Sequence, residues 1–173
     1  MINMERDYDI GLRIYQEKVQ NQQDLPKEAV EIIEKYINQG VIPLEAKILA
    51  HFSVLAEVEL ARAEISEDVF KDEDDMCWIC NFIINSEGHV IELYLHHTEE
   101  VFLTLLPKML CSLEYLEVIC FPNNLMKVIP EWISDLQFLR VLDVNNVEQP
   151  NPEVPDSIMP FLNSLESFNE FYK

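Results

Sequence analysis

Four cysteines and four histidines are the side chains in this sequence best suited to metal or thiol chemistry. The nearest set of possible zinc ligands is Cys77, Cys80, His89, His96 and His97. In an extended segment the two cysteines, three residues apart, point to opposite faces, and no second C-x-x-C or H-x-x-x-H spacing follows. A redox pair would precede a helix, whereas the residues after Cys80 have a strand pattern. We therefore expect structural cysteines, no metal and no cofactor.

Catalytic motifs of other classes are missing from the sequence. The three glycines, Gly11, Gly40 and Gly88, are too scattered for a phosphate-binding loop, and neither G-x-S-x-G nor H-E-x-x-H occurs. A thiol nucleophile remains conceivable at Cys111, with His97 as its base, or at Cys120. We expect a protein that is not an enzyme and keep a cysteine-dependent enzyme as the less favoured alternative.

The charge balance narrows the class of partner. The chain has 32 acidic and 12 basic residues, a formal net charge of -20, and so repels nucleic-acid phosphates and anionic membranes. The run Asp72–Asp75 lacks the glycine and distal glutamate of a calcium loop and is typical of a solvated loop. We expect no nucleic acid and no membrane partner, whereas a basic protein would be complementary.

The cellular compartment is indicated by the lack of secretion-signal and membrane-span patterns in the sequence. The first residues have neither a basic segment nor an apolar segment of a secretion signal, and no stretch approaches the length of a membrane span. The cysteines are too few for a disulfide framework. We expect a cytoplasmic protein.

Residues 1–75 have the patterns of about three helices. Apolar residues recur at helical spacing over 4–22 and again over 26–39, and the segment from Leu44 to Leu60 is apolar on most of its circumference. From residue 64 the periodicity is lost in an acidic linker. The third helix is therefore expected to be buried.

At about residue 78 the period changes to two, which predicts a β-hairpin. Phe82 and Ile84 belong to the first strand, Asn85–Gly88 to the turn and His89–Leu95 to the returning strand. Gly88 is placed where a positive φ is needed.

An internal repeat follows the hairpin. Leu106-Pro107 and Ile129-Pro130 lie 23 residues apart, and five further apolar pairs keep that offset. These pairs are Leu110 and Ile133, Leu113 and Leu136, Leu116 and Leu139, Ile119 and Leu142, and Phe121 and Val144.

The unit that runs from Asn124 through Ile129-Pro130 to Leu142-x-Val144 resembles the consensus of the leucine-rich-repeat family. The strand Val90-x-x-Leu93-x-Leu95 also fits, and a degenerate unit continues from Val154-Pro155 to Phe168. The resemblance covers residues 78–172 and implies parallel strands, a hairpin cap like that of small prokaryotic members, and a turn-capping role for Asn124.

Together these patterns predict an α/β protein: a short leucine-rich-repeat solenoid of parallel strands with an N-terminal β-hairpin cap and an α-helical N-terminal part. We expect the helical part at residues 1–75 and the solenoid at 76–173. Terminal units need a cover, so the third helix should pack near the hairpin and join both parts in one folding body.

Side chains between the inward residues of each strand must point to the other, concave face. The residues predicted to bind a partner there are Glu92, Tyr94, His96, Val118, Cys120, Val141, Asp143 and Asn145. Tyr94, Cys120 and Asp143 should form its central row. The alternative is that the first helix or the C-terminus covers this face, which makes Val118 and Val141 part of the core.

We expect an adaptor or inhibitor that presents this face to a protein partner and that is a monomer by itself. A structural or self-associating unit without a dedicated partner is the main alternative. Fold analogy alone cannot name the partner.

Overall fold

The structure is a computed structural model that describes residues 27–56, 58, 60–64, 80–95, 106–122, 124–145 and 151–169. The helix expected at 4–22 and the acidic run Asp72–Asp75 lie outside these residues. So do Cys77, His96 and His97, three of the side chains considered as zinc ligands.

The chain is an α/β protein with one six-stranded, mostly parallel sheet, in which the strands follow their order in the sequence. The helices are α2 (Lys27–Asn38), α3 (Pro43–Ala56) and α4 (Met159–Leu162). The short 3-10 helices are η2 (Lys108–Ser112), η3 (Glu131–Asp135) and η4 (Asp156–Ile158). The strands are β1 (Leu60–Arg62), β2 (Cys80–Ile84), β3 (Val90–Tyr94), β4 (Val118–Cys120), β5 (Val141–Asp143) and β6 (Ser167–Phe168).

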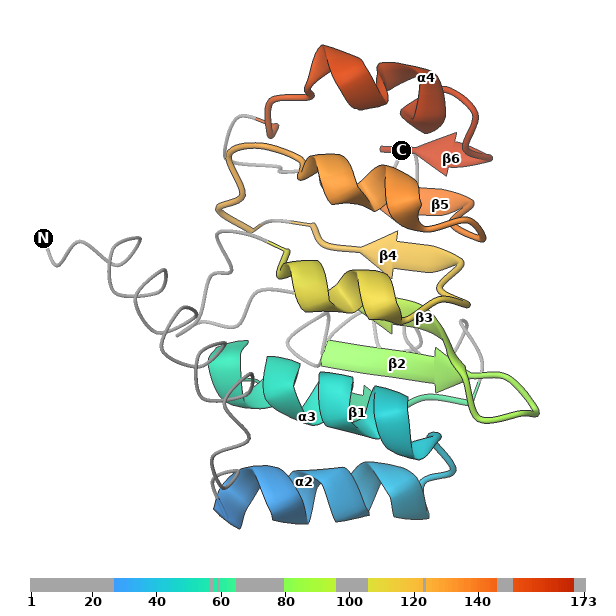
Figure 1. Cartoon of the computed structure of the whole chain (residues 1–173). Helices are drawn as coiled ribbons and strands as arrows, with labels where there is room; N and C mark the ends of the chain where they lie inside the picture. The colour runs from blue at the N-terminus through green and yellow to red at the C-terminus, as the bar shows by residue number, and fades with distance from the viewer. Residues whose placement is uncertain are drawn as a thin grey trace, which may run out of the picture.

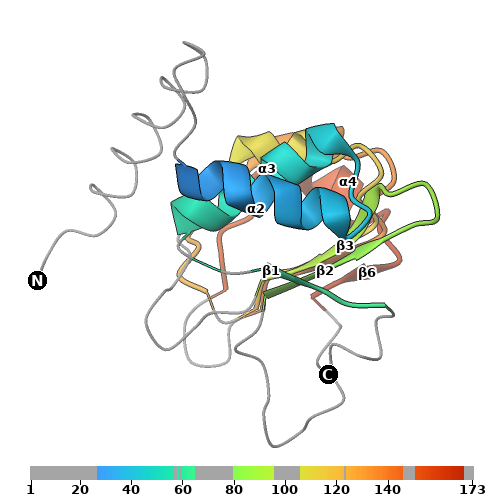
Figure 2. The same cartoon turned by 90° about the horizontal axis from the view of Figure 1, so that it is seen from below.

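The helices lie together on one face of the sheet. Figure 1 shows them as a column in front of the stacked strands, and Figure 2 shows the helices and the sheet as two layers. We call this side the helix side and the opposite side the second face. The described helices include none that is long and apolar enough to cross a membrane.

The two N-terminal helices confirm one prediction and correct another. The helix expected over 26–39 is α2, but the next helix, expected to reach Leu60, ends at Ala56. Leu60 begins β1, which pairs in parallel with β2. Because Val58 and Leu60 alternate with glutamates, these residues fit the end of an apolar helix and the start of a strand equally well.

The predicted hairpin is confirmed, with β2 and β3 antiparallel. Asn85 Oδ1 accepts hydrogen bonds from the backbone N–H groups of Glu87 and His89 at 2.9 and 3.0 Å, which closes the turn. Gly88 has φ +87°, as expected, and a Cβ at this position would lie 2.4 Å from the carbonyl oxygen of Gly40. The glycine is therefore needed by the turn and also by the close approach of the loop between α2 and α3.

The 23-residue repeat of the sequence is present in the backbone. Pro107 and Pro130, both extended, precede η2 and η3. The N–H group of Leu110 donates to the carbonyl of Pro107 at 3.0 Å, and that of Ile133 donates to Pro130 at 3.1 Å. A third proline, Pro155, precedes η4 in the same way. Each proline therefore starts a short helix on the helix side of the sheet.

The strands of successive units are in register. Leu93 lies beside Ile119, Ile119 beside Leu142, and Leu142 beside Phe168. All five apolar pairs predicted from the 23-residue offset are buried in one core cluster between the strands and the helices. Their burial confirms which strand residues point to the helix side.

Asn124 is buried at the turn that follows β4. Its Nδ2 donates to the carbonyl oxygens of Leu95 and Pro122 at 2.9 and 3.1 Å. The side chain therefore satisfies backbone groups of two neighbouring strand ends, which is the capping role that the sequence resemblance implies.

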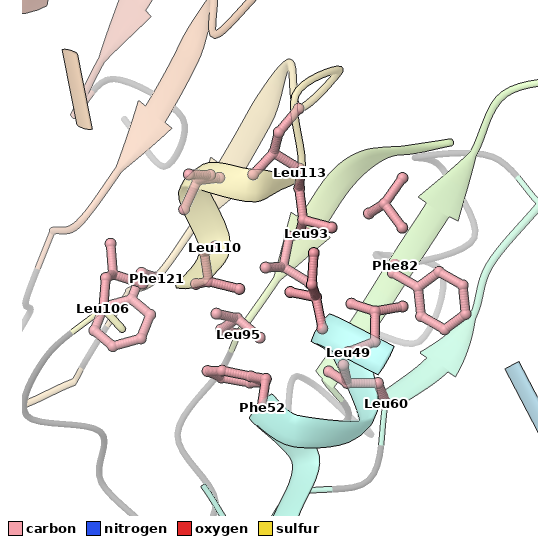
Figure 3. Packing of buried hydrophobic residues seen from close by; sticks show 14 of the residues in the cluster. Leu49, Phe52, Leu60, Phe82, Leu93, Leu95, Leu106, Leu110, Leu113 and Phe121 are labelled. Carbon is pink, nitrogen blue, oxygen red and sulfur yellow. The ribbon is translucent and has the colours of Figure 1, made fainter. Parts of the chain in front are cut away.

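Helix α3 packs against the hairpin and the first repeated unit, as predicted. Leu49 and Phe52 of α3 lie in the same cluster as Phe82, Leu95 and Leu110 (Figure 3). The core cluster thus contains residues of both the helical part and the repeated part.

A polar contact joins the same two regions. The carboxylate of Glu45, buried in the first turn of α3, accepts the N–H group of Val90 at 2.6 Å. Its other oxygen lies 2.9 Å from Nδ1 of His89. The Glu45 carboxylate therefore fixes α3 to the start of β3.

Candidate functional site

The central row predicted on the second face is present. Tyr94 lies beside Cys120, and Cys120 lies beside Asp143 in the next strand. The residue before each of them belongs to the core cluster of the helix side. Neighbouring residues of these strands therefore point alternately to the two faces.

The side chains of this face are nevertheless buried, which corrects the expectation of an accessible binding surface. The buried ones are Glu92, Tyr94, Val118, Cys120, Val141 and Asp143, with exposed fractions between 0% and 7%. Asn145 is half-buried, and His96 lies outside the described residues. Tyr94, Val118, Cys120 and Val141 form a second hydrophobic cluster with Ile83. The burial agrees with the alternative that this face is core.

The second face also contains two buried carboxylates. The hydroxyl of Tyr94 donates to Glu92 Oε2 at 2.6 Å, and the N–H group of Asn145 donates to Asp143 Oδ1 at 2.9 Å. Asp143 Oδ2 is buried and has no hydrogen-bond partner. Burial raises the pKa of the Asp143 carboxyl above its ordinary value, and the bond from Asn145 offsets part of that rise.

Cys120 has the wrong surroundings for a nucleophile. Burial raises the pKa of its thiol, and the nearby Asp143 and Glu92 raise it further. A thiol in this environment stays protonated at neutral pH and reacts slowly. Cys111, the other residue considered for thiol chemistry, is half-buried in η2, and His97, its proposed base, lies outside the described residues.

The zinc ligands considered above are only partly placed. Cys80 is buried in β2, and His89 faces Glu45. Within the described ranges, His, Cys, Asp and Glu side chains form no group of three suited to a metal ion.

A more accessible set of side chains lies where the strands begin. Short turns, at residues 85–89, 114–117, 137–140 and 163–166, lead into β3, β4, β5 and β6. They follow one another along the right-hand edge of the molecule in Figure 1. We call these four turns the strand-start edge.

Three aromatic rings form a column along the strand-start edge. The ring centroids of His89 and Tyr115 are 4.0 Å apart, and those of Tyr115 and Phe138 are 5.6 Å apart with nearly parallel planes. Each ring comes four residues before the inward residue of its strand, so the three occupy equivalent positions. Tyr115 is 38% exposed and Phe138 is 55% exposed.

A column of charges lies beside the rings. Arg140 contacts Glu117 Oε2 through Nε at 3.0 Å and Glu166 Oε2 through a terminal nitrogen at 3.3 Å. Each residue comes two positions before the inward residue of its strand. One arginine therefore bridges the carboxylates of the units on either side.

The sequence predictions did not include the strand-start edge. Tyr115 and Phe138, like Glu117 and Arg140, are 23 residues apart, so the repeat alignment contained the signal. The apolar ladder by itself gives no indication of these two columns.

A scan against family models and searches of curated proteins and of solved structures found no match for this chain.

Proposed function

We propose that this chain is a short leucine-rich-repeat solenoid and that it binds a protein partner as an adaptor or inhibitor. The observation that supports this proposal is the unit repeated at a 23-residue offset, in which a proline-led 3-10 helix is followed by a parallel strand. Units of this kind bury their apolar residues only against neighbouring units, and the resulting stack presents long surfaces suited to protein recognition.

The accessible part of the stack favours the strand-start edge as the contact surface. Tyr115 and Phe138 offer exposed aromatic area, and aromatic side chains are enriched at protein interfaces. Contact through Tyr94, Cys120 and Asp143, the surface expected from the sequence, would need these buried side chains to become exposed.

Charge suggests the kind of partner and a monomeric state. A net charge of -20 favours a basic protein and opposes the association of two copies. Cys111 and Cys120 are free thiols, which supports a reducing compartment such as the cytoplasm as part of the same proposal.

The proposal is tested by affinity capture from a native lysate with quantitative comparison of three proteins. These are the unmodified chain, the edge variant Tyr115→Ala/Phe138→Ala and the second-face variant Tyr94→Phe/Asp143→Asn, each first shown to be folded by its melting curve. A partner that binds the unmodified chain reversibly and is lost with one variant supports a binding function and identifies the surface.

The alternative of a self-associating structural unit predicts a different result. Light scattering over a range of concentrations would then show a reversible oligomer, and no saturable protein partner would be captured. A concentration-independent monomer with a saturable partner excludes that alternative.

A further inference from the structure

We propose that the strand-start edge binds an arginine-bearing segment of a protein partner, with the guanidinium group stacked on the ring of Phe138 and paired with the carboxylate of Glu166. This inference deepens the proposed protein-binding function and rests on it.

The column ends at Phe138. In β6 the position four residues before the inward Phe168 is occupied by Ser164, so the next equivalent side chain is not aromatic. The Ser164 hydroxyl donates to the carbonyl of Phe161 at 2.6 Å, within its own turn. Phe138 stacks on Tyr115 and is still 55% exposed, so more than half of the residue remains accessible to a partner.

Two carboxylates lie beside the same turn. Arg140, two residues after Phe138, contacts both Glu117 and Glu166, so both acidic groups lie beside the turn that carries the ring. The Glu166 side chain is 68% exposed. Glu87 and Glu114 are also exposed on the strand-start edge. The four turns of this edge therefore contain four glutamates and one arginine.

An exposed aromatic face beside carboxylates suits a guanidinium group in particular. Arginine stacks on aromatic rings through its planar cation and can pair with a carboxylate at the same time, whereas lysine offers only a compact charge. A second copy of the chain is a poor occupant, because two molecules of charge -20 repel each other.

The direct test is an NMR titration of the full chain with a defined probe. The probe is an end-blocked hexapeptide of three arginines alternating with glycine, and the comparison peptide contains citrulline, which keeps the planar shape without the charge. We expect backbone amide shifts concentrated in residues 137–140 and 163–166, weaker binding as salt is added, and little binding of the citrulline peptide.

Matched variants of the exposed side chains sharpen the test. Phe138→Ala should lower the affinity for the arginine peptide about two- to fivefold, the range expected of an exposed cation–π contact. Phe138→Trp should raise that affinity. Val128→Ala removes a comparably exposed apolar side chain outside the strand-start edge and should leave the affinity unchanged. Glu166→Gln should weaken binding, while Glu153→Gln, another exposed glutamate, should change it less.

Several results would overturn the inference. They are equal affinities for the Phe138→Ala and Val128→Ala proteins, equal binding of the citrulline peptide, or shifts centred outside the strand-start edge. Concentration-dependent shifts of the edge without peptide would identify a second copy as the occupant instead. If the Phe138→Ala protein binds the lysate partner with the same affinity as the unmodified chain, the arginine site fails while the proposed binding function stands.

Discussion

The second face of the sheet and the strand-start edge are both built from equivalent positions of the repeated units, but they differ in accessibility. On the second face, Tyr94, Cys120 and Asp143 lie in one row and are buried. On the edge, Tyr115 and Phe138 form a column and are exposed. The repeat therefore determines which residues align, whereas packing around the repeated units determines which of the aligned residues are accessible.

The charged side chains of the two regions also differ in their exposure to water. Arg140 and its two glutamates are partly exposed, so water screens their attraction and each pair adds little to stability. Asp143 is buried with one oxygen lacking a hydrogen bond, which makes its ionised form costly. Charge on the edge is thus screened by water, whereas the ionised form of Asp143 on the second face destabilises the fold.

The largest effect should come from the core between strands and helices, which both regions need. Replacing Leu142 by Ala should lower the free energy of unfolding by about 2–5 kcal/mol, because it opens a cavity in a fully packed cluster. Leu116→Ala and Leu139→Ala should act in the same way. Urea unfolding curves check this, and marginal losses at all three positions would contradict the assignment of inward residues.

A smaller loss of stability should distinguish a substitution on the second face from one on the strand-start edge. Val118→Ala should cost about 1–2 kcal/mol, because two buried methyl groups are lost. Phe138→Ala should cost less despite removing a larger side chain, because the ring is more than half exposed. If urea unfolding shows Phe138→Ala to be the more damaging change, the contrast between the two regions is wrong.

The smallest effect should be a pH-dependent gain in the free energy of unfolding when Asp143 is replaced by Asn. Its pKa is raised in the folded chain above the ordinary 3.8, so ionisation destabilises the fold at neutral pH and ceases to do so as the pH falls through the folded pKa toward 3.8. Asp143→Asn should therefore increase the free energy of unfolding at pH 7, with a gain that shrinks toward pH 4.

The control for this prediction is Asp135→Asn, which changes an exposed acid in η3. Its effect on the free energy of unfolding should not follow the same pH dependence. A loss of stability with Asp143→Asn at pH 7 would show that the buried charge is compensated.

Local patterns were enough to predict much of the fold. Asn85 and Gly88 predicted the hairpin turn, and the proline steps and the 23-residue offset predicted the repeated unit and the inward residues of β4 and β5. These features depend on residues close in sequence or on a regular repeat. A pattern of side chains is sufficient to reveal either.

The features that were missed depend on the tertiary environment. Val58 and Leu60 suit a buried helix as well as a buried strand, so β1 could not be distinguished from the end of α3. Alternation gave the direction of Tyr94 and Asp143 correctly, but alternation does not say whether anything lies over a face. Exposure of Phe138 likewise depends on the neighbouring unit.

The most direct test of the contrast is NMR relaxation of the unmodified chain in the presence of an inert, soluble paramagnetic chelate. The chelate broadens signals of side chains that solvent can reach and needs no substitution. We expect strong broadening of the ring signals of Phe138 and Tyr115 and weak broadening of the methyl signals of Val118 and Val141. Methyl signals of Val118 and Val141 broadened as strongly as the Phe138 ring would contradict this expectation and return the sheet face to consideration as the open binding surface.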